Sequence, residues 1–88
     1  MKIAISLLTC SDSKLSIPCI NSLLNSDLVN YEYKIFCVDN NSSDNTIDFL
    51  NSLKCPLFLI ENKFNEGIVL PRIKIMDQIL KEEYDYTV

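Results

Sequence analysis

Apolar and polar positions fall into blocks that predict four strands and three helices. The apolar runs at 3–8, 33–38 and 57–61 have the composition of strands covered on both faces, and a further run begins near 86–88. Between them, apolar residues recur at helical spacing. The three stripes are Ile17, Ile20, Leu23 and Leu24, then Ile47, Leu50 and Leu53, then Ile73, Met76, Ile79 and Leu80.

The order strand-helix-strand-helix-strand-helix-strand, with short links, is typical of a parallel sheet with right-handed crossovers. We therefore predict an α/β fold of three layers with a mostly parallel sheet, βαβαβαβ, that breaks off as its fourth strand starts. Residues 1–88 would form one incomplete domain. Pro18 is expected in the first turn of its helix, and Ser43 or Asp44 is expected to cap the second helix.

Composition and charge narrow the class of protein. The chain is 48% hydrophobic and 23% charged, as in a globular protein, and its net charge is −4. Without a basic patch, neither nucleic acid nor an anionic membrane surface is an expected partner. No apolar run approaches the length of a transmembrane helix.

The four cysteines, Cys10, Cys19, Cys37 and Cys55, are widely spaced. We predict free thiols in a reducing compartment, and hence a cytoplasmic location. Cys10 and Cys37 adjoin apolar runs and are expected to act as small buried hydrophobes. A zinc site is not expected, because the chain has no His and no close Cys pair.

Candidate chemistry centres on Asp39, which ends an apolar strand and precedes the polar turn 40–43. Open α/β sheets place ligand groups at this end of their strands. A carboxylate there can equally serve only as the acceptor that closes the turn. Phosphate-binding glycine loops are excluded because Gly67 is the only glycine, and the absence of His excludes Ser-His-Asp and Cys-His arrangements within this chain.

Five segments occur together in a recognisable order: 5–9, 19–25, 38–46 with the letters V-D-N-N-S-S-D-N-T, 65–67 and Arg72. Together they resemble the amino-terminal half of a family 2 glycosyltransferase with the GT-A fold, which is Rossmann-like. The resemblance implies that the chain binds the nucleotide part of a nucleotide-diphosphate-sugar, with a UDP-sugar as the expected donor. The full enzyme would transfer the sugar to a glycan, lipid or protein acceptor.

The resemblance also assigns site residues. Thr9 and Ser11 match positions that line the nucleotide base pocket, and Asp39 matches the acid that binds the uracil or ribose, with Asn41 beside it. Arg72 matches a basic residue near the base and diphosphate, where a cation favours phosphate oxygens. Plain alternatives remain for three of them: Asp39 as a turn acceptor, Thr9 as an ordinary strand end, and Arg72 as a solvated helix residue.

Some positions depart from the family's pattern. Leu8 and Cys10 stand where the family usually has Pro and an aromatic residue, and Ile73 stands where Asn often follows the Arg. The family's Asp-x-Asp motif, which binds a divalent metal, would follow the last strand and is not in this chain. Mg²⁺ or Mn²⁺ is therefore expected in the full-length enzyme. We expect this chain alone to bind no metal, to contain no catalytic residue and to be inactive.

Two other readings stay open. The chain could be a non-catalytic α/β module that docks a partner, or self-associates, through its exposed sheet edge. A receiver-like phosphoacceptor domain is weaker, because it needs clustered acids and a Lys after a later strand, and only Asp12 could join Asp39.

Overall fold

Four parallel strands form one sheet in the order β3-β2-β1-β4. The computed structural model describes residues 1–88, apart from the side chain of Val29. The strands are β1 (Lys2–Thr9), β2 (Glu32–Asn40), β3 (Leu57–Asn62) and β4 (Tyr86–Thr87). The helices are α1 (Ser13–Leu24), α2 (Thr46–Ser52) and α3 (Val69–Leu80), with a short 3₁₀ helix at Asp27–Asn30. The predicted α/β class and element order are confirmed.

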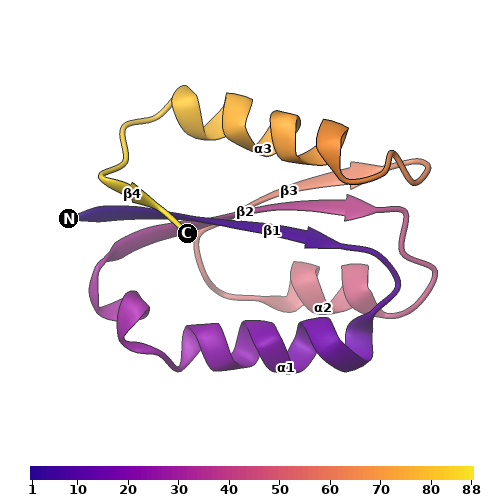
Figure 1. Cartoon of the computed structure of the whole chain (residues 1–88). Coiled ribbons are helices and arrows are strands. Elements are labelled where there is room, and N and C mark those ends of the chain that lie inside the picture. The colour runs from indigo at the N-terminus through magenta and orange to yellow at the C-terminus, as the bar shows by residue number, and fades with distance from the viewer.

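The helices cover both faces of the sheet. Helices α1 and α2 lie on one face and α3 lies on the other (Figure 1). From β1 the chain moves outward to β2 and β3, and it then returns past β1 to place β4 on the other side. In open α/β sheets, ligands bind outside the carboxyl ends of the strands where the strand order reverses in this way. The carboxyl end of β1 is therefore next to the expected crevice.

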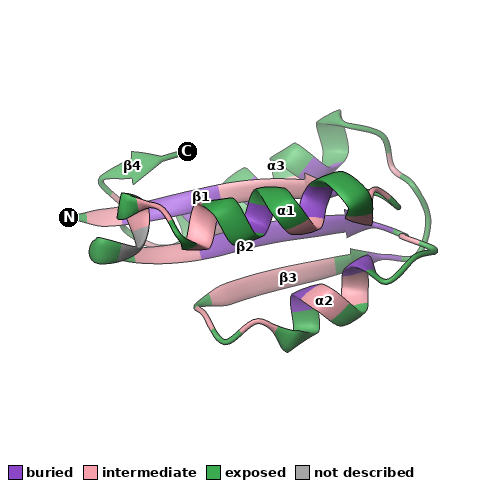
Figure 2. Ribbon diagram, turned by 90° about the horizontal axis from the view of Figure 1, so that it is seen from below, coloured by how far each residue is buried: buried purple, intermediate pink, exposed green. Residues whose placement is uncertain are grey.

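Strand β2 is the centre of the core, and Figure 2 shows its carboxyl half buried between β1 and β3. Its alternate side chains point to opposite faces. Phe36 and Val38 pack with Ile75 and Ile79 of α3, while Cys37 packs with residues of α1 and α2. Burial on both faces explains the unbroken apolar run that predicted this strand.

The predicted apolar face of α3 is wrong in three of its four residues. The helix buries Pro71, Ile75 and Ile79, whereas Ile73, Met76 and Leu80 are 50%, 42% and 75% exposed. Only Ile79 was predicted correctly. The helix carries two apolar stripes at helical spacing. The sheet packs against the stripe of Pro71, Ile75 and Ile79, which was not the one predicted.

Two details of the other helices also differ from prediction. Helix α1 begins at Ser13, so Pro18 lies inside the helix and not in its first turn. The N-cap residue of α2 is Asn45, and not Ser43 or Asp44 as predicted. Asp44 nevertheless accepts a hydrogen bond from the backbone N–H of Thr46 at 3.0 Å, which is the role expected of a cap.

All four cysteines are free, as predicted. Cys37 is buried, and burial raises the pKa of its thiol to about 12. The prediction that Cys10 is buried is wrong, because β1 ends at Thr9 and Cys10 is exposed in the loop beyond. Across the part of the chain that the structure describes, no helix has the length and apolar character needed to cross a membrane.

Candidate functional site

The buried side chains of Thr9 and Asp39 meet at the carboxyl ends of the neighbouring strands β1 and β2. The two residues are register partners and are 3% and 1% exposed. The Thr9 hydroxyl donates to Asp39 Oδ1 at 2.6 Å. Ser42 donates twice to the same carboxylate, from its backbone N–H to Oδ2 at 2.8 Å and from its hydroxyl to Oδ1 at 2.5 Å. Asp39 therefore closes the turn after β2, and three of its roughly four acceptor positions are used.

The loops after β1 and β2 are held together by serine contacts. The Ser11 backbone N–H donates to the Ser42 hydroxyl, and the Ser43 backbone N–H donates to the Ser11 hydroxyl, both at 2.8 Å. Ser11 and Asn41 have φ of +48° and +54°, in the left-handed region that costs energy for residues other than glycine. Two of the predicted site residues thus lie at strained backbone positions, and cross-loop bonds hold the first of them in place.

Asp44 joins the amino-terminal ends of the two helices on this face. Its Oδ2 accepts from the backbone N–H of Ser13 in α1, and its Oδ1 accepts from the Thr46 hydroxyl and amide at the start of α2. These bonds lower the pKa of Asp44 to about 2, with that from the Thr46 hydroxyl the largest cause. The carboxylate also sits where helix dipoles favour negative charge.

A shallow hollow of about 490 Å³ opens beside these loops. Its lining residues are Ser11, Asp12, Ser13, Lys14, Leu15 and Asp44. Ser11 lines this space and is bonded to Ser42, which in turn binds Asp39, so the hollow lies next to the loop that covers the Thr9–Asp39 pair.

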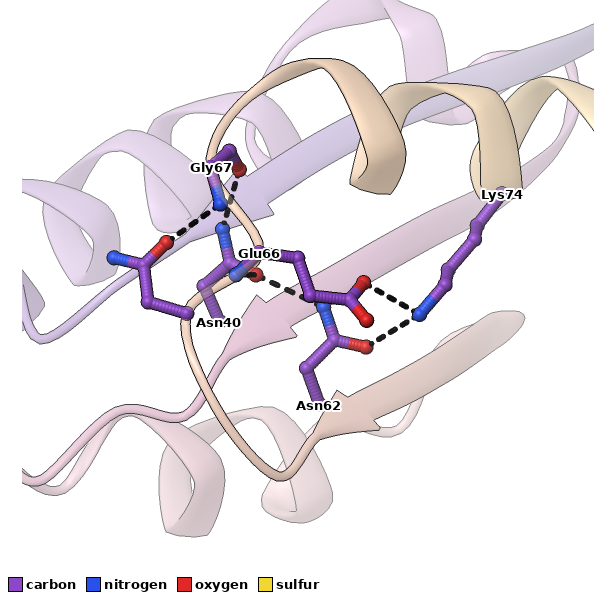
Figure 3. A network of polar contacts seen from close by, with 6 residues as sticks. Asn40, Asn62, Glu66, Gly67 and Lys74 are labelled. Carbon is purple, nitrogen blue, oxygen red and sulfur yellow. Dashed lines mark hydrogen bonds and ion pairs between the residues drawn. The ribbon is translucent and has the colours of Figure 1, made fainter.

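A second polar network fixes the loop before α3 on the opposite face of the sheet (Figure 3). Asn40 donates to the Gly67 carbonyl at 2.8 Å and accepts from Asn62, its register partner on β3, at 2.9 Å. Lys74 of α3 donates to Asn62 and to Glu66. Gly67 has φ of +81°, a conformation that glycine adopts without strain. The network fixes the amino-terminal end of α3 next to the carboxyl ends of β2 and β3.

Arg72 is separated from the other predicted site residues. It is exposed on α3 and lines a hollow of about 130 Å³ with Ser6, Ile75 and Met76. Ser6 precedes Thr9 by three positions, or about 10 Å along the strand, and its side chain points to the other face of the sheet. The structure therefore brings Thr9, Ser11 and Asp39 together on the α1/α2 side and leaves Arg72 on the α3 side.

Several residues that form hydrogen bonds at the carboxyl ends of the strands were not identified from the sequence as members of a site. Ser42 and Ser43 were assigned only to the turn, and Asn40 and Asn62 were not paired. The signal that could have paired the asparagines is that each ends an apolar strand, because neighbouring parallel strands bring such ends together.

Among the described residues, no group of three or more His, Cys, Asp or Glu side chains is arranged so that it could bind a metal ion. The carboxylates of Asp39 and Asp44 are already occupied by hydrogen bonds within the chain. Among the residues that the structure describes, these carboxylates therefore do not fit a divalent cation site.

Comparison with known proteins agrees with this architecture. Residues 13–80 match the model of glycosyl transferase family 2. The chain is 34% identical over 70 residues to a poly(ribitol-phosphate) beta-glucosyltransferase of Bacillus spizizenii, covering 76% of this chain and 11% of that protein. No solved structure was found to match. The matched region runs from the first residue of α1 to the last residue of α3. From this match, the chain belongs to glycosyl transferase family 2.

Proposed function

We propose that this chain binds the nucleotide part of a nucleotide-diphosphate-sugar, with a UDP-sugar as the donor. The observation that carries the proposal is the Thr9–Asp39 pair at adjacent strand ends, in a chain of a sugar-transferring family. A carboxylate accepts from N–H and O–H donors, which a uracil ring and a ribose both present.

Binding would require a local rearrangement. Asp39 is almost fully buried. Its Oδ1 atom already accepts hydrogen bonds from the hydroxyl groups of both Ser42 and Thr9. We propose that a nucleotide donor displaces the Ser42 hydroxyl from Asp39 while the Ser42 backbone N–H stays bound to Oδ2. If the hydroxyl turns away, the bond that it accepts from the Ser11 N–H is lost as well, and the bond from the Ser43 N–H to the Ser11 hydroxyl remains to hold Ser11. Ser11 and Asn41 would then border the base. Their strained conformations suit residues held ready for a ligand.

Arg72 would act at the diphosphate. Its guanidinium is exposed and can form charge-assisted bonds with phosphate oxygens. Because Arg72 lies on the other face of the sheet, the nucleotide would cross the carboxyl edge of β1 to reach both ends of the site.

The chemistry of transfer would need groups that lie outside this chain. The chain spans 11% of the length of its relative, and its described residues do not form a metal site. We propose that the full enzyme uses Mg²⁺ or Mn²⁺ and transfers its sugar to a glycan, lipid or protein acceptor. The relative's name makes a glucose donor and a poly(ribitol-phosphate) acceptor the first substrates to test. The chain alone would bind without turnover, in the reducing cytoplasm that its free cysteines suit.

Isothermal titration with UDP tests this proposal. The variant Asp39→Asn keeps the size of the side chain but removes its charge, and Asp48→Asn makes the same change at an exposed position of α2. We expect Asp39→Asn to weaken UDP binding about tenfold or more, the scale of a lost charge-assisted hydrogen bond. Asp48→Asn should bind as the unchanged chain does. Equal affinity in all three proteins would refute the assignment of Asp39.

A further inference from the structure

Helix α3 begins without a capping side chain of its own. Its N-cap residue is Ile68, which forms no side-chain capping bond, and its first turn contains no acidic residue. A Ser, Thr, Asn or Asp side chain ordinarily supplies such a contact. The start of α3 is fixed instead by the polar network of Figure 3, whose members are Asn40, Asn62, Glu66, Gly67 and Lys74.

Asn40 is the centre of this network. The residue is 3% exposed. Its Nδ2 donates to the Gly67 carbonyl at 2.8 Å. Its Oδ1 accepts from Asn62 Nδ2 at 2.9 Å and from the Glu66 backbone N–H at 3.3 Å. One buried amide therefore binds both a donor and an acceptor of the loop before α3, which a carboxylate of the same size could not do because it has no hydrogen to donate.

The direction of these bonds is set at both ends of the network. Lys74 has only donors, so Asn62 turns its Oδ1 toward the ammonium group, at 3.0 Å. The Asn62 Nδ2 then faces Asn40 Oδ1, and the Asn40 Nδ2 is left for the Gly67 carbonyl, which can only accept. A chain of bonds from a charged donor to a backbone acceptor thus specifies one arrangement of both amides, and each bond polarises the next.

Asn40 also adjoins the proposed nucleotide contact, because it follows Asp39 in the chain. Alternate side chains of a strand point to opposite faces, so the Asp39 carboxylate lies on the α1/α2 side and the Asn40 amide on the α3 side. The same strand end therefore holds the carboxylate proposed to bind the nucleotide and the amide that fixes the start of α3. The Asn40 carbonyl also accepts from the Cys10 thiol at 3.4 Å, which joins the loop after β1 to this strand end.

Arg72 lies in the turn of α3 that the network fixes. Its backbone N–H donates to the Ile68 carbonyl at 3.4 Å, and Ile68 directly follows Gly67, whose carbonyl Asn40 binds. Two residues after Arg72, the side chain of Lys74 binds Asn62 at the end of β3. The backbone of Arg72 is therefore held from both directions along the chain, although its own side chain is exposed.

We propose that Asn40 is a positioning residue for the diphosphate: through the Gly67 carbonyl it sets the first turn of α3, and hence the place from which Arg72 reaches the phosphate oxygens. The proposal rests on the nucleotide binding proposed above, and it adds a residue that does not itself touch the nucleotide. With α3 fixed in this way, Asp39 and Arg72 keep a constant separation across the carboxyl edge of the sheet. A preorganised backbone also lowers the entropy that Arg72 loses on binding.

Separate titrations with uridine and with UDP, followed by amide chemical shifts, distinguish the two ends of the site. Asn40→Ser keeps a neutral side chain that is too short to bind both Gly67 and Asn62. It should weaken UDP binding at least fivefold and uridine binding less than twofold, because Asp39 keeps its own contacts. Ile79→Val is the control, because it removes a buried methylene group from the same helix away from the network, and it should weaken UDP binding less than twofold.

Asn62→Ser removes the next amide of the network and should also weaken UDP more than uridine. It carries the same test should circular dichroism show that Asn40→Ser does not fold. Loss of uridine and UDP affinity to the same degree in the folded variant would overturn the positioning role and leave the proposed function intact. Absence of UDP binding by the unchanged chain would overturn the proposed function itself, and the positioning role with it.

Combination with Arg72→Gln shows whether Asn40 acts through Arg72. In a chain that already carries Arg72→Gln, the further change Asn40→Ser should alter UDP affinity less than twofold, because the guanidinium that Asn40 positions is gone. A merely structural role would instead reduce UDP affinity by the same factor with or without Arg72. Such additive losses would overturn the proposal.

Discussion

The hydrogen bond from Thr9 to Asp39 gives the most direct test of how strongly the buried end of the sheet is held. Thr9→Val removes the hydroxyl and replaces it with a methyl group of similar size. Asp39, which is 1% exposed, then loses one of its three donors and cannot replace it with water. A hydrogen bond to a charged group contributes about 1.5–3 kcal/mol, so we expect the free energy of unfolding to fall by about 2 kcal/mol.

Urea unfolding followed by circular dichroism measures this loss, and an unchanged denaturant slope would confirm that only stability has changed. In a domain of this size the same loss lowers Tm by about 8–16 °C. Thr46→Val is the matched comparison, because Thr46 is also buried but donates at 2.5 Å to Asp44, whose carboxylate is exposed. Water can replace that bond, so the loss should be smaller. A loss below about 0.5 kcal/mol for Thr9→Val, or equal losses for the two variants, would show that burial of Asp39 does not strengthen its bond to Thr9.

Three further predictions concern the helices and thiols. Ile75→Ala should lower the free energy of unfolding by about 2–4 kcal/mol, whereas Ile73→Ala should lower it by less than about 0.5 kcal/mol; similar losses would contradict the observed face of α3. Because the folded pKa of Asp44 is about 2, below the unfolded value near 3.9, its contribution to stability is present above pH 4 and is lost as the pH falls toward 2. Asp44→Asn should therefore flatten the urea midpoint against pH in that range, and an unchanged profile would contradict this. Under native conditions a thiol reagent should label Cys10 rapidly and Cys37 only on unfolding, as peptide mass mapping would show; early labelling of Cys37 would contradict its burial.

The sequence predicted the sheet well because burial on both faces leaves an unbroken apolar run, as in β2. It did not predict which side of α3 is buried, because two stripes fit helical spacing and only packing against Phe36 and Val38 decides between them. Family resemblance suggested Thr9 and Asp39, and strand register places them together.

The contacts around the site were harder to predict. The bonds of Ser11 to the loop after β2 join positions about thirty residues apart, and they depend on left-handed backbone at Ser11 that no local pattern requires. The separation of Arg72 from Thr9 follows from strand alternation once β1 is placed between α1 and α3. The face of the sheet on which a helix lies depends on tertiary packing, and no short sequence motif reveals it.

Nucleotide binding at the carboxyl ends of β1 and β2 is the central claim, and amide chemical shifts during a UDP titration test it most directly. Millimolar UDP should shift the amide signals of Thr9, Ser11, Asp39, Ser42 and Arg72, while the signals on the far side of α2 stay in place. The Ser42 signal should move most, because its hydroxyl leaves Asp39 as the nucleotide binds. Unchanged spectra at these positions, or shifts confined to another part of the chain, would contradict the claim.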